Sequence, residues 1–425
     1  MLLSIAETKD RFLADGRPFF YLADTVWNAF TNATLEEWED YLRFRAAQGF
    51  NAVQISILPI VHDMSGGTDE LRPFAAKAEG DGWDFHSPDP AYFAKAGRML
   101  EMARAHGFVP ALIVLWVNYV RDTWAAGFHP ELVMPDEALP GYIDTVVRTL
   151  GPSEPVYLIS GDTDLPTEAA FGMYRTAMEL LKKRQPESLI SYHPKPGLEL
   201  DGRLIGHPDY DFYMYQQGHS PEARAVTGAS YHYGLPVKRP IVNGEPYYEA
   251  IGYFNRYGRF NAPDIRRSFW DSVLSGAKAG FTYGAHGVWS WHKAGQPFTS
   301  EEAWGTPADW RTALLLPGAG DVAYGKWLLE SFGLFDVEPS QHRVLKYAEH
   351  VTMAASPDDS VIAVYMPYDM GTCIEADLGG YDVDLLELGT RSVLKPRLRI
   401  EGGVTEIAMH GRNADALLLA RRRNR

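Results

Sequence analysis

The sequence predicts an α/β protein in which a (β/α)8 barrel, the TIM barrel fold, is followed by a small all-β sandwich domain. Eight short runs of apolar or β-branched residues alternate with segments of helical periodicity, and this alternation is typical of a parallel barrel. Beyond about residue 338, short strand-like runs follow one another with Pro, Asp and Gly between them. We therefore predict a barrel domain over residues 1–337 and a β-sandwich domain over residues 338–425. The predicted barrel strands are 18–23, 51–58, 109–116, 156–160, 188–192, 211–215, 240–243 and 280–284.

Local signals support the predicted elements in chain order. Asp15 and Gly16 form a turn signal, so a small hairpin should lead into the first barrel strand. Thr34 is a suitable N-cap for a helix that starts at Leu35, and Glu37 completes a capping box. No glycine-rich dinucleotide motif follows the first strand, which disfavours a doubly wound sheet. Further helices are predicted over residues 91–106, 168–184 and 264–278, each ending near Gly or Pro.

The composition is that of a globular protein that binds neither nucleic acid nor membrane. Apolar residues make up 46% of the chain and charged residues 22%, which supports a sizeable core. The formal net charge of −15 would repel a phosphate backbone, and basic residues cluster only at 421–425. The longest apolar run, residues 109–117, is far shorter than the ~20 residues of a membrane span.

Cysteine content and the N-terminus bear on the compartment. Cys373 is the only cysteine, so neither an intramolecular disulfide nor a thiolate-rich metal site can form. Residues 1–7 lack the basic start and apolar core of a secretory signal. We expect a cytoplasmic protein and make no prediction of its oligomeric state.

Aromatic residues and strand ends point to a carbohydrate ligand. Aromatic side chains make up 13% of the chain, and sugar rings stack their C–H faces on such side chains. Polar and aromatic residues also end the predicted strands, where the active site of such a barrel lies. From these positions we predict substrate binding by Asp24, Trp27, Trp116, Asn118, His193, Tyr215, Gln217, His219, Tyr247 and Trp289.

Two strand ends carry a carboxylate directly after an apolar run. The fourth predicted strand leads through Gly161 into Asp162, and the seventh leads into Glu245. Hydrolysis of a glycosidic bond needs one carboxylic acid for the leaving oxygen and one carboxylate for the anomeric carbon. We therefore predict Asp162 and Glu245 as the catalytic pair, with Asp164 as a competing acid. The alternative for each is a structural role, in which it caps a helix or pairs with an Arg.

Several motifs resemble the apiosidase-like glycoside hydrolases, and this resemblance spans about residues 8–410. It implies a (β/α)8 barrel followed by a small C-terminal β-domain that is often described as collagen-binding. It also implies that Asp162 is the acid/base and Glu245 the nucleophile of a retaining double displacement. The motifs that carry the resemblance are residues 16–27, 48–54, 161–162, 217–219 and 243–249.

The sequence therefore predicts a glycosidase that cleaves a plant or bacterial oligosaccharide with retention of configuration. Retention requires the two carboxyl groups to lie roughly 5–5.5 Å apart. The alternative is a carbohydrate-binding protein that keeps the hydrolase scaffold without turnover. The histidines show no His-x-His or His-Glu-x-x-His spacing, so we predict no metal and no other cofactor. Two long connections, 62–85 and 119–135, could close a pocket around a short substrate.

Overall fold

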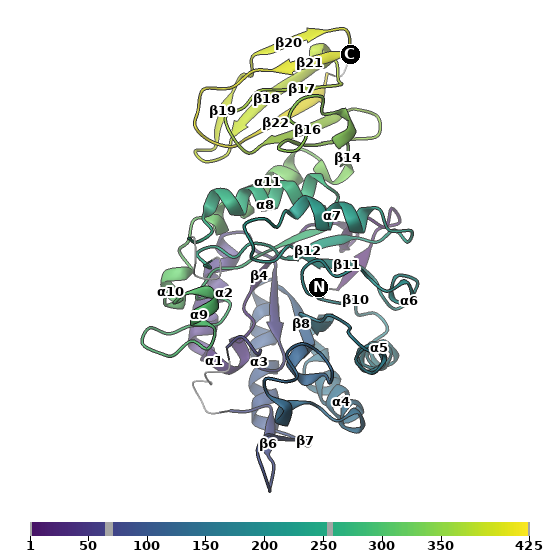
Figure 1. Cartoon of the computed structure of the whole chain (residues 1–425), viewed down its shortest axis with the longest axis vertical. Coiled ribbons are helices and arrows are strands. Elements are labelled where there is room, and N and C mark those ends of the chain that lie inside the picture. The colour runs from purple at the N-terminus through teal and green to yellow at the C-terminus, as the bar shows by residue number, and fades with distance from the viewer. Residues whose placement is uncertain (1, 64–70, 253–257, 424–425) are drawn as a thin grey trace.

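Eight parallel strands form the barrel of the computed structural model, which describes residues 2–63, 71–252 and 258–423 (Figure 1). In hydrogen-bonded order the strands run β10-β9-β8-β5-β4-β13-β12-β11, and every neighbouring pair is parallel. Each predicted run overlaps one of these strands, so the predicted fold class is confirmed. The strands are β4 (Tyr21–Thr25), β5 (Ala52–Ser56), β8 (Val109–Trp116), β9 (Val156–Gly161), β10 (Ile190–Ser191), β11 (Tyr213–Gln216), β12 (Ile241–Glu245) and β13 (Gly280–Tyr283).

Helices follow the strands and form the outer layer. Thr34 and Glu37 make the predicted capping box, with Thr34 accepting from the Glu37 amide at 3.1 Å. The predicted helix 264–278 is shifted toward the N-terminus, because Asn261 caps it and Pro263 fits its first turn; it ends at Leu274, before the turn at Gly276. The helices are α1 (Ala29–Asn32), α2 (Leu35–Ala47), α3 (Pro90–Ala105), α4 (Leu139–Thr149), α5 (Glu168–Arg184), α6 (Gly202–Ile205), α7 (Ala225–Tyr233), α8 (Ala262–Leu274), α9 (Glu301–Trp304), α10 (Trp310–Ala313) and α11 (Gly318–Ser331).

Two small sheets lie outside the barrel strands. The strands β1 (Leu3–Ile5), β2 (Phe12–Ala14) and β3 (Arg17–Phe19) form an antiparallel sheet before the barrel. Asp15 and Gly16 join β2 to β3 with φ of 49° and 74°, the left-handed backbone that a tight hairpin turn needs. The predicted hairpin is therefore present, although it takes Pro18 and Phe19 from the predicted first strand. The strands β6 (Phe74–Ala76) and β7 (Trp83–Pro88) pair within the long connection before α3.

A buried ion pair joins the first barrel strand to the first long helix. Arg45 of α2 donates from Nε to Oδ2 of Asp24 at 2.6 Å, and both side chains are fully buried. Tyr41 donates to the same oxygen at 2.9 Å. Burial raises the pKa of Asp24, although Arg45 and Tyr41 act to lower it. Asp24 therefore faces the helix layer and not the barrel mouth, which corrects its prediction as a sugar-binding residue.

The C-terminal region is an all-β sandwich. A six-stranded sheet, β14-β15-β16-β22-β18-β19, faces a three-stranded sheet, β17-β21-β20. An apolar cluster that includes Val364, Ile374 and Ile407 fills the space between them. The strands are β14 (Glu338–Pro339), β15 (Thr352–Ala355), β16 (Val361–Met366), β17 (Thr372–Ile374), β18 (Tyr381–Glu387), β19 (Ser392–Leu394), β20 (Leu398–Glu401), β21 (Val404–Ile407) and β22 (Ala416–Arg422).

The six-stranded sheet packs against α8 and α11 of the barrel (Figure 1). Alternate residues of its strands point to opposite faces, so Tyr365 and Leu417 join the barrel's apolar cluster while Val364 and Leu418 join the cluster of the sandwich. Arg266 of α8 also donates to Asp415 at 2.8 Å. The two parts therefore pack against each other, whereas the division at residues 337 and 338 stays a prediction.

Replacing Arg45 with Met should destabilise the fold strongly. The change leaves the buried Asp24 carboxyl without its cationic partner, which costs about 3–5 kcal/mol of unfolding free energy. Arg43→Met in the same helix is the matched control, because Arg43 and Asp40 form an exposed pair and its loss should change stability by less than about 0.5 kcal/mol. Urea unfolding followed by circular dichroism measures both values, and equal values would refute this role for Arg45.

Candidate active site

Asp162 follows directly after β9 at the barrel mouth. Its φ is 59°, in the left-handed region that Asp tolerates better than most residues. Gly161 precedes it because a Cβ there would lie 2.3 Å from the ring of Trp116. The indole of Trp124 donates to the Asp162 carbonyl at 3.0 Å. The backbone at the strand end therefore sets the direction of this carboxyl group.

Glu245 ends β12, where the register against β11 shifts. Tyr215 is opposite Asn243, but Gln216 is opposite Glu245, so Gly244 is an extra residue in β12. Such a bulge changes which face the following side chain takes. Asn243 thus donates outward to Ser272 of α8 at 3.0 Å, while Glu245 enters the barrel mouth. A Cβ on residue 244 would lie 2.3 Å from the Met214 side chain, which explains the glycine.

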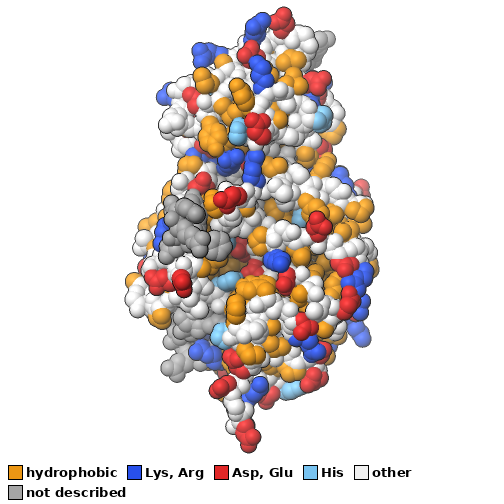
Figure 2. Space-filling model, viewed as in Figure 1, with side chains coloured by type: hydrophobic (Ala, Val, Ile, Leu, Met, Phe, Trp, Pro, Cys, Tyr) orange, Lys and Arg blue, Asp and Glu red, His pale blue; other side chains and the backbone are white. Residues whose placement is uncertain are grey.

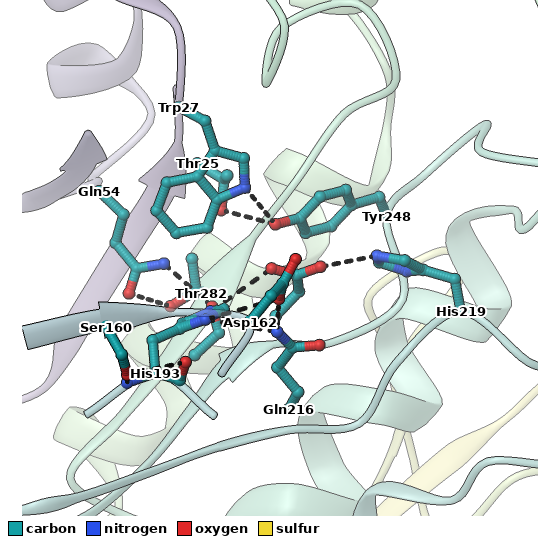
Figure 3. A network of polar contacts seen from close by, with 12 residues as sticks. Thr25, Trp27, Gln54, Ser160, Asp162, His193, Gln216, His219, Tyr248 and Thr282 are labelled. Atoms are coloured by element: carbon teal, nitrogen blue, oxygen red, sulfur yellow. Dashed lines mark hydrogen bonds and ion pairs between the residues drawn. The ribbon is translucent and has the colours of Figure 1, made fainter. Parts of the chain in front are cut away.

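The carboxylates of Asp162 and Glu245 both lie close to the imidazole of His193. One oxygen of Asp162, one oxygen of Glu245 and a ring nitrogen of His193 all lie within 4.8 Å of one another. His193 has no exposed surface, and its Nε2 is 3.4 Å from Oε2 of Glu245. Its Nδ1 lies 3.9 Å from Oδ1 of Asp162. The ring of His193 therefore lies close to both carboxylates, and Figure 3 shows it beside Asp162.

Each carboxylate also has its own nitrogen donors. Nε2 of His219 is 2.9 Å from Oε1 of Glu245. The side-chain amide of Gln216 donates to Oδ1 of Asp162, and Nε2 of His62 lies 3.0 Å from Oδ2. Three of the four carboxylate oxygens are therefore within hydrogen-bond distance of a side-chain nitrogen, and Oε2 of Glu245 has no well-aligned hydrogen-bond partner among the described residues.

Histidines set the charge of the nucleophile candidate. Burial acts to raise the pKa of Glu245, but hydrogen bonds and charge from His193 and His219 hold it well below its usual range. Burial acts to lower the pKa of His193, yet the hydrogen bond to Glu245 and the charges of both carboxylates raise it above its usual value. Glu245 is therefore ionised at neutral pH.

A narrow hollow opens above the two carboxylates. Figure 2 shows acidic and histidine side chains near the middle of the barrel, with hydrophobic side chains beside them. Tyr248 forms one wall and accepts from the indole of Trp27 at 3.1 Å. Burial raises the pKa of Tyr248 well above its usual value, with a contribution from the charge of Glu245, so its hydroxyl stays protonated. The lining residues are Trp27, Ile60, His62, Trp116, Asp162, His219, Glu245, Tyr248, Ile251, Trp289 and Trp304.

The structure brings half of the predicted substrate-binding residues to this site. Trp27, Trp116, His219 and Trp289 line the hollow beside the catalytic pair. His193 lies beneath it, packed against the rings of Trp27 and Trp116.

The other predicted binding residues do not reach the hollow. Asn118 is fully buried beside its floor without lining it. Tyr215 donates outward to Ser272 at 3.1 Å, and Gln217 accepts from Ser268 of α8. Tyr247 stacks on Phe260 with ring centroids 4.0 Å apart. None of these four residues lines the hollow beside the carboxylates, and their sugar-binding role stays a prediction.

Sequence reasoning missed six described residues that contact the carboxylate of Asp162 or line the hollow, namely Gln216, Tyr248, His62, Trp304, Ile60 and Ile251. Gln216 stands next to a predicted residue, so the alternation of side chains along a strand was the signal that could have found it. Tyr248 also stands next to a predicted residue but lies beyond the end of β12, where the path of the loop decides which ring faces the hollow. His62 and Trp304 come from long loops after β5 and β13, and no local pattern in the sequence marks them. Residues 64–70 of the first loop lie outside the described part of the chain.

The family is decided by a match over most of the chain. Residues 7–336 match the model of the apiosidase-like catalytic domain. The chain belongs to the apiosidase-like family. As a member of this family it is a glycosidase, and the hollow at the barrel mouth is where the family's catalytic residues are expected. A comparison with curated protein sequences gives no match.

Solved structures of glycoside hydrolases share this family member's fold. A structure described as a glycoside hydrolase is 18% identical, with a TM-score of 0.79, 99% of this chain covered and 97% of the other. A family 5 glycoside hydrolase from Bacteroides vulgatus is 17% identical, with a TM-score of 0.79 and coverage of 99% and 93%. A family 5 mannosidase from Rhizomucor miehei is 13% identical, with a TM-score of 0.52 and coverage of 78% and 98%. None of the helices in the described ranges combines the length and apolarity of a membrane span.

Replacing His193 with Gln should cost more stability in acid than in alkali. A pKa raised in the folded state stabilises the fold below the unfolded value of about 6.5, and this stabilisation is lost as the pH rises through the folded pKa. We therefore expect a larger loss of unfolding free energy at about pH 5.5 than at about pH 9, measured by urea titration.

His286→Gln is a control of opposite sign. Burial lowers the pKa of His286 to about 3, so this residue stays neutral when folded and disfavours the fold in acid. Replacement of His286 should therefore lower the unfolding free energy less at low pH than at high pH. A cost for His193→Gln that does not change with pH would contradict the charged state assigned to His193.

Proposed function

We propose that the protein is a retaining glycosidase that removes one terminal sugar from an oligosaccharide, with Asp162 as acid/base and Glu245 as nucleophile. The observation that carries the proposal is the pair of carboxylates, which have oxygens within 4.8 Å of each other at the mouth of the barrel. A separation of roughly 5–5.5 Å suits direct attack by one carboxylate, whereas about 6.5–9.5 Å leaves room for a water molecule between acid and sugar.

In the first step an ionised Glu245 attacks the anomeric carbon. The bond from this carbon to the leaving oxygen breaks, and Asp162 gives its proton to that oxygen. His193 and His219 keep Glu245 ionised but leave it in contact with the hollow. The products of this step are a glycosyl ester on Glu245 and a free alcohol.

In the second step Asp162 takes a proton from water, and the water oxygen attacks the anomeric carbon. The ester bond to Glu245 then breaks, and the sugar leaves with its original configuration. His62 and Gln216 hold the two oxygens of Asp162 and fix its position for both proton transfers. The tyrosine hydroxyl of Tyr248 supplies a neutral polar group next to the ester.

The size of the hollow supports cleavage of a terminal sugar. The hollow is narrow and leaves room beside the two carboxylates for at most one sugar ring. Its walls are largely tryptophan and tyrosine, which offer flat apolar surfaces to the C–H faces of a ring.

The same geometry disfavours a divalent cation between the carboxylates. Asp162, His193 and Glu245 are ligand types that a metal could use, and their atoms are close enough. However, both oxygens of Asp162 already face nitrogens of His62 and Gln216, and Oε1 of Glu245 faces His219, so only Oε2 of Glu245 has no well-aligned hydrogen-bond partner in the described part of the chain. A metal would have to displace these donors, so we derive no step through one.

The proposed function is tested by a panel of 4-nitrophenyl glycosides and plant or bacterial oligosaccharides, with and without EDTA. Release of a single terminal sugar that is unaffected by EDTA is the expected result. Proton NMR of the first product should show the anomer of the substrate, and the inverted anomer would rule out Glu245 as nucleophile. Binding without turnover would instead favour a silent carbohydrate-binding protein.

Replacing Glu245 with Gln should remove turnover and keep the fold. The amide has the shape of the carboxylate but cannot form the ester, so kcat/KM should fall by roughly four orders of magnitude or more. Initial rates on the best substrate of the panel measure this change, and circular dichroism checks the fold. Loss of less than about tenfold would exclude a nucleophilic role.

Replacing Asp162 with Asn should affect substrates according to their leaving groups. A sugar leaving group needs the proton, so kcat/KM on an oligosaccharide should fall by about 10²–10⁴-fold, whereas an activated aryl glycoside should lose much less in the first step. Azide should restore turnover of the aryl glycoside, because it replaces the water that Asp162 would activate. Asp164→Asn is the matched control, since Asp164 does not line the hollow; the same pattern for this variant would transfer the acid role to Asp164.

A further inference from the structure

Two exposed aromatic side chains lie beside the acid, outside the hollow. Trp124 and Phe128 belong to the long connection after β8, and they are 38% and 62% exposed. Their rings contact each other edge to face, with centroids 5.8 Å apart. Exposed apolar side chains that lie together beside a ligand-binding hollow are typical of a ligand-binding groove.

A line of rings connects this pair to the floor of the hollow. The ring of His62 lies 6.3 Å from that of Trp116 and 5.8 Å from that of Trp124. His62 also contacts the Asp162 carboxylate at 3.0 Å. The aromatic surface therefore leads outward from the hollow along the side of Asp162.

This side of the site is where the leaving group must lie. The acid has to be within hydrogen-bond reach of the leaving oxygen, so the group that carries this oxygen lies against Asp162. Trp124 donates to the Asp162 backbone, whereas the close contacts of Glu245 are His193 and His219. The rings of Trp124 and Phe128 therefore lie on the side of the glycosidic bond that faces Asp162.

The chemistry of this surface suits the face of a sugar ring. The indole N–H of Trp124 is already used in the bond to the Asp162 carbonyl, and Phe128 has no polar side-chain atom. The two side chains can therefore offer only ring faces, which recognise C–H groups and not a pattern of hydroxyls.

We propose that Trp124 and Phe128 form a binding subsite for the sugar ring of the leaving group. The inference rests on the proposed function and deepens it. The hollow selects the sugar that is released, and the aromatic pair binds its neighbour in the oligosaccharide by stacking. The subsite tolerates different sugars at this position, because it makes no hydroxyl-specific contacts.

The test compares three substrates that carry the sugar selected in the panel. These are the glycosyl fluoride, whose leaving group has no ring, the 4-nitrophenyl glycoside and a disaccharide. Trp124→Ala should lower kcat/KM on the disaccharide about tenfold more than on the fluoride. Phe128→Ala should show the same preference to a smaller extent, mainly through KM, because its ring contacts Trp124 instead of the acid itself.

The Trp124→Phe variant distinguishes stacking on a sugar ring from the hydrogen bond that supports the backbone of Asp162. It keeps a ring but loses the bond to the Asp162 carbonyl, so it should retain most of the disaccharide activity that Trp124→Ala loses. Trp327→Ala is the matched control, since Trp327 is 54% exposed on α11 and stacks on Tyr324 away from the hollow. This control should leave all three substrates unchanged.

Three results would overturn the subsite. They are equal losses on the fluoride and the disaccharide, a loss for Trp124→Phe as large as for Trp124→Ala, and a loss on the 4-nitrophenyl glycoside that exceeds the loss on the disaccharide. The last result would assign the surface to aromatic leaving groups instead of sugars. If the unaltered protein hydrolysed none of the three, the proposed function itself would fail, and that outcome is distinct from hydrolysis without a role for the aromatic pair.

Discussion

The site depends on keeping one buried carboxylate negatively charged. An isolated ionised Glu in a hollow walled by Trp and Tyr would take up a proton, because burial disfavours charge. His193 and His219 reverse this preference, and they follow β10 and β11, the two strands at the ends of the hydrogen-bonded order. Their geometry in turn requires the extra residue Gly244, which turns Glu245 into the mouth while Asn243 bonds to the helix layer. The charge of a single group thus accounts for the bulge, for the glycine at the bulge and for the placement of two histidines.

The sequence was sufficient for the barrel and for the placement of Asp162 and Glu245 at its mouth, but not for the walls of the site. The end of a strand can be recognised from the end of an apolar run in the sequence. Asp162 and Glu245 follow closely after two such runs. Which of two adjacent side chains faces inward depends on the register of each strand. A shift of one residue turns a side chain from the barrel mouth to the helix layer. Gln216 was missed in favour of Gln217 for this reason, whereas Tyr247 and Tyr248 lie beyond the end of β12, where the path of the loop decides which ring faces the hollow. His62 comes from a loop whose path depends on tertiary packing, so periodicity contains no information about it.

The two acids are held in different ways that fit different tasks. Glu245 has imidazole partners that favour its charged form. Asp162 is fixed by its left-handed backbone, by the amide of Gln216 and by His62, which lines the hollow. A nucleophile must stay ionised, whereas an acid/base must change its protonation state twice in each turnover. The contacts of Glu245 and Asp162 therefore support the proposed roles of nucleophile and acid/base more specifically than the distance between the two carboxylates does.

The six-stranded sheet of the C-terminal region has apolar side chains on both faces, one against the sandwich and one against the barrel. Thr352 of this sheet donates to Asp271 of α8 at 2.5 Å, and the next residue of the helix, Ser272, accepts from Asn243 behind Glu245. Loss of this region would expose an apolar helix surface just behind Glu245. A substitution on one side of the contact between barrel and sheet therefore has to fit the matching surface on the other side.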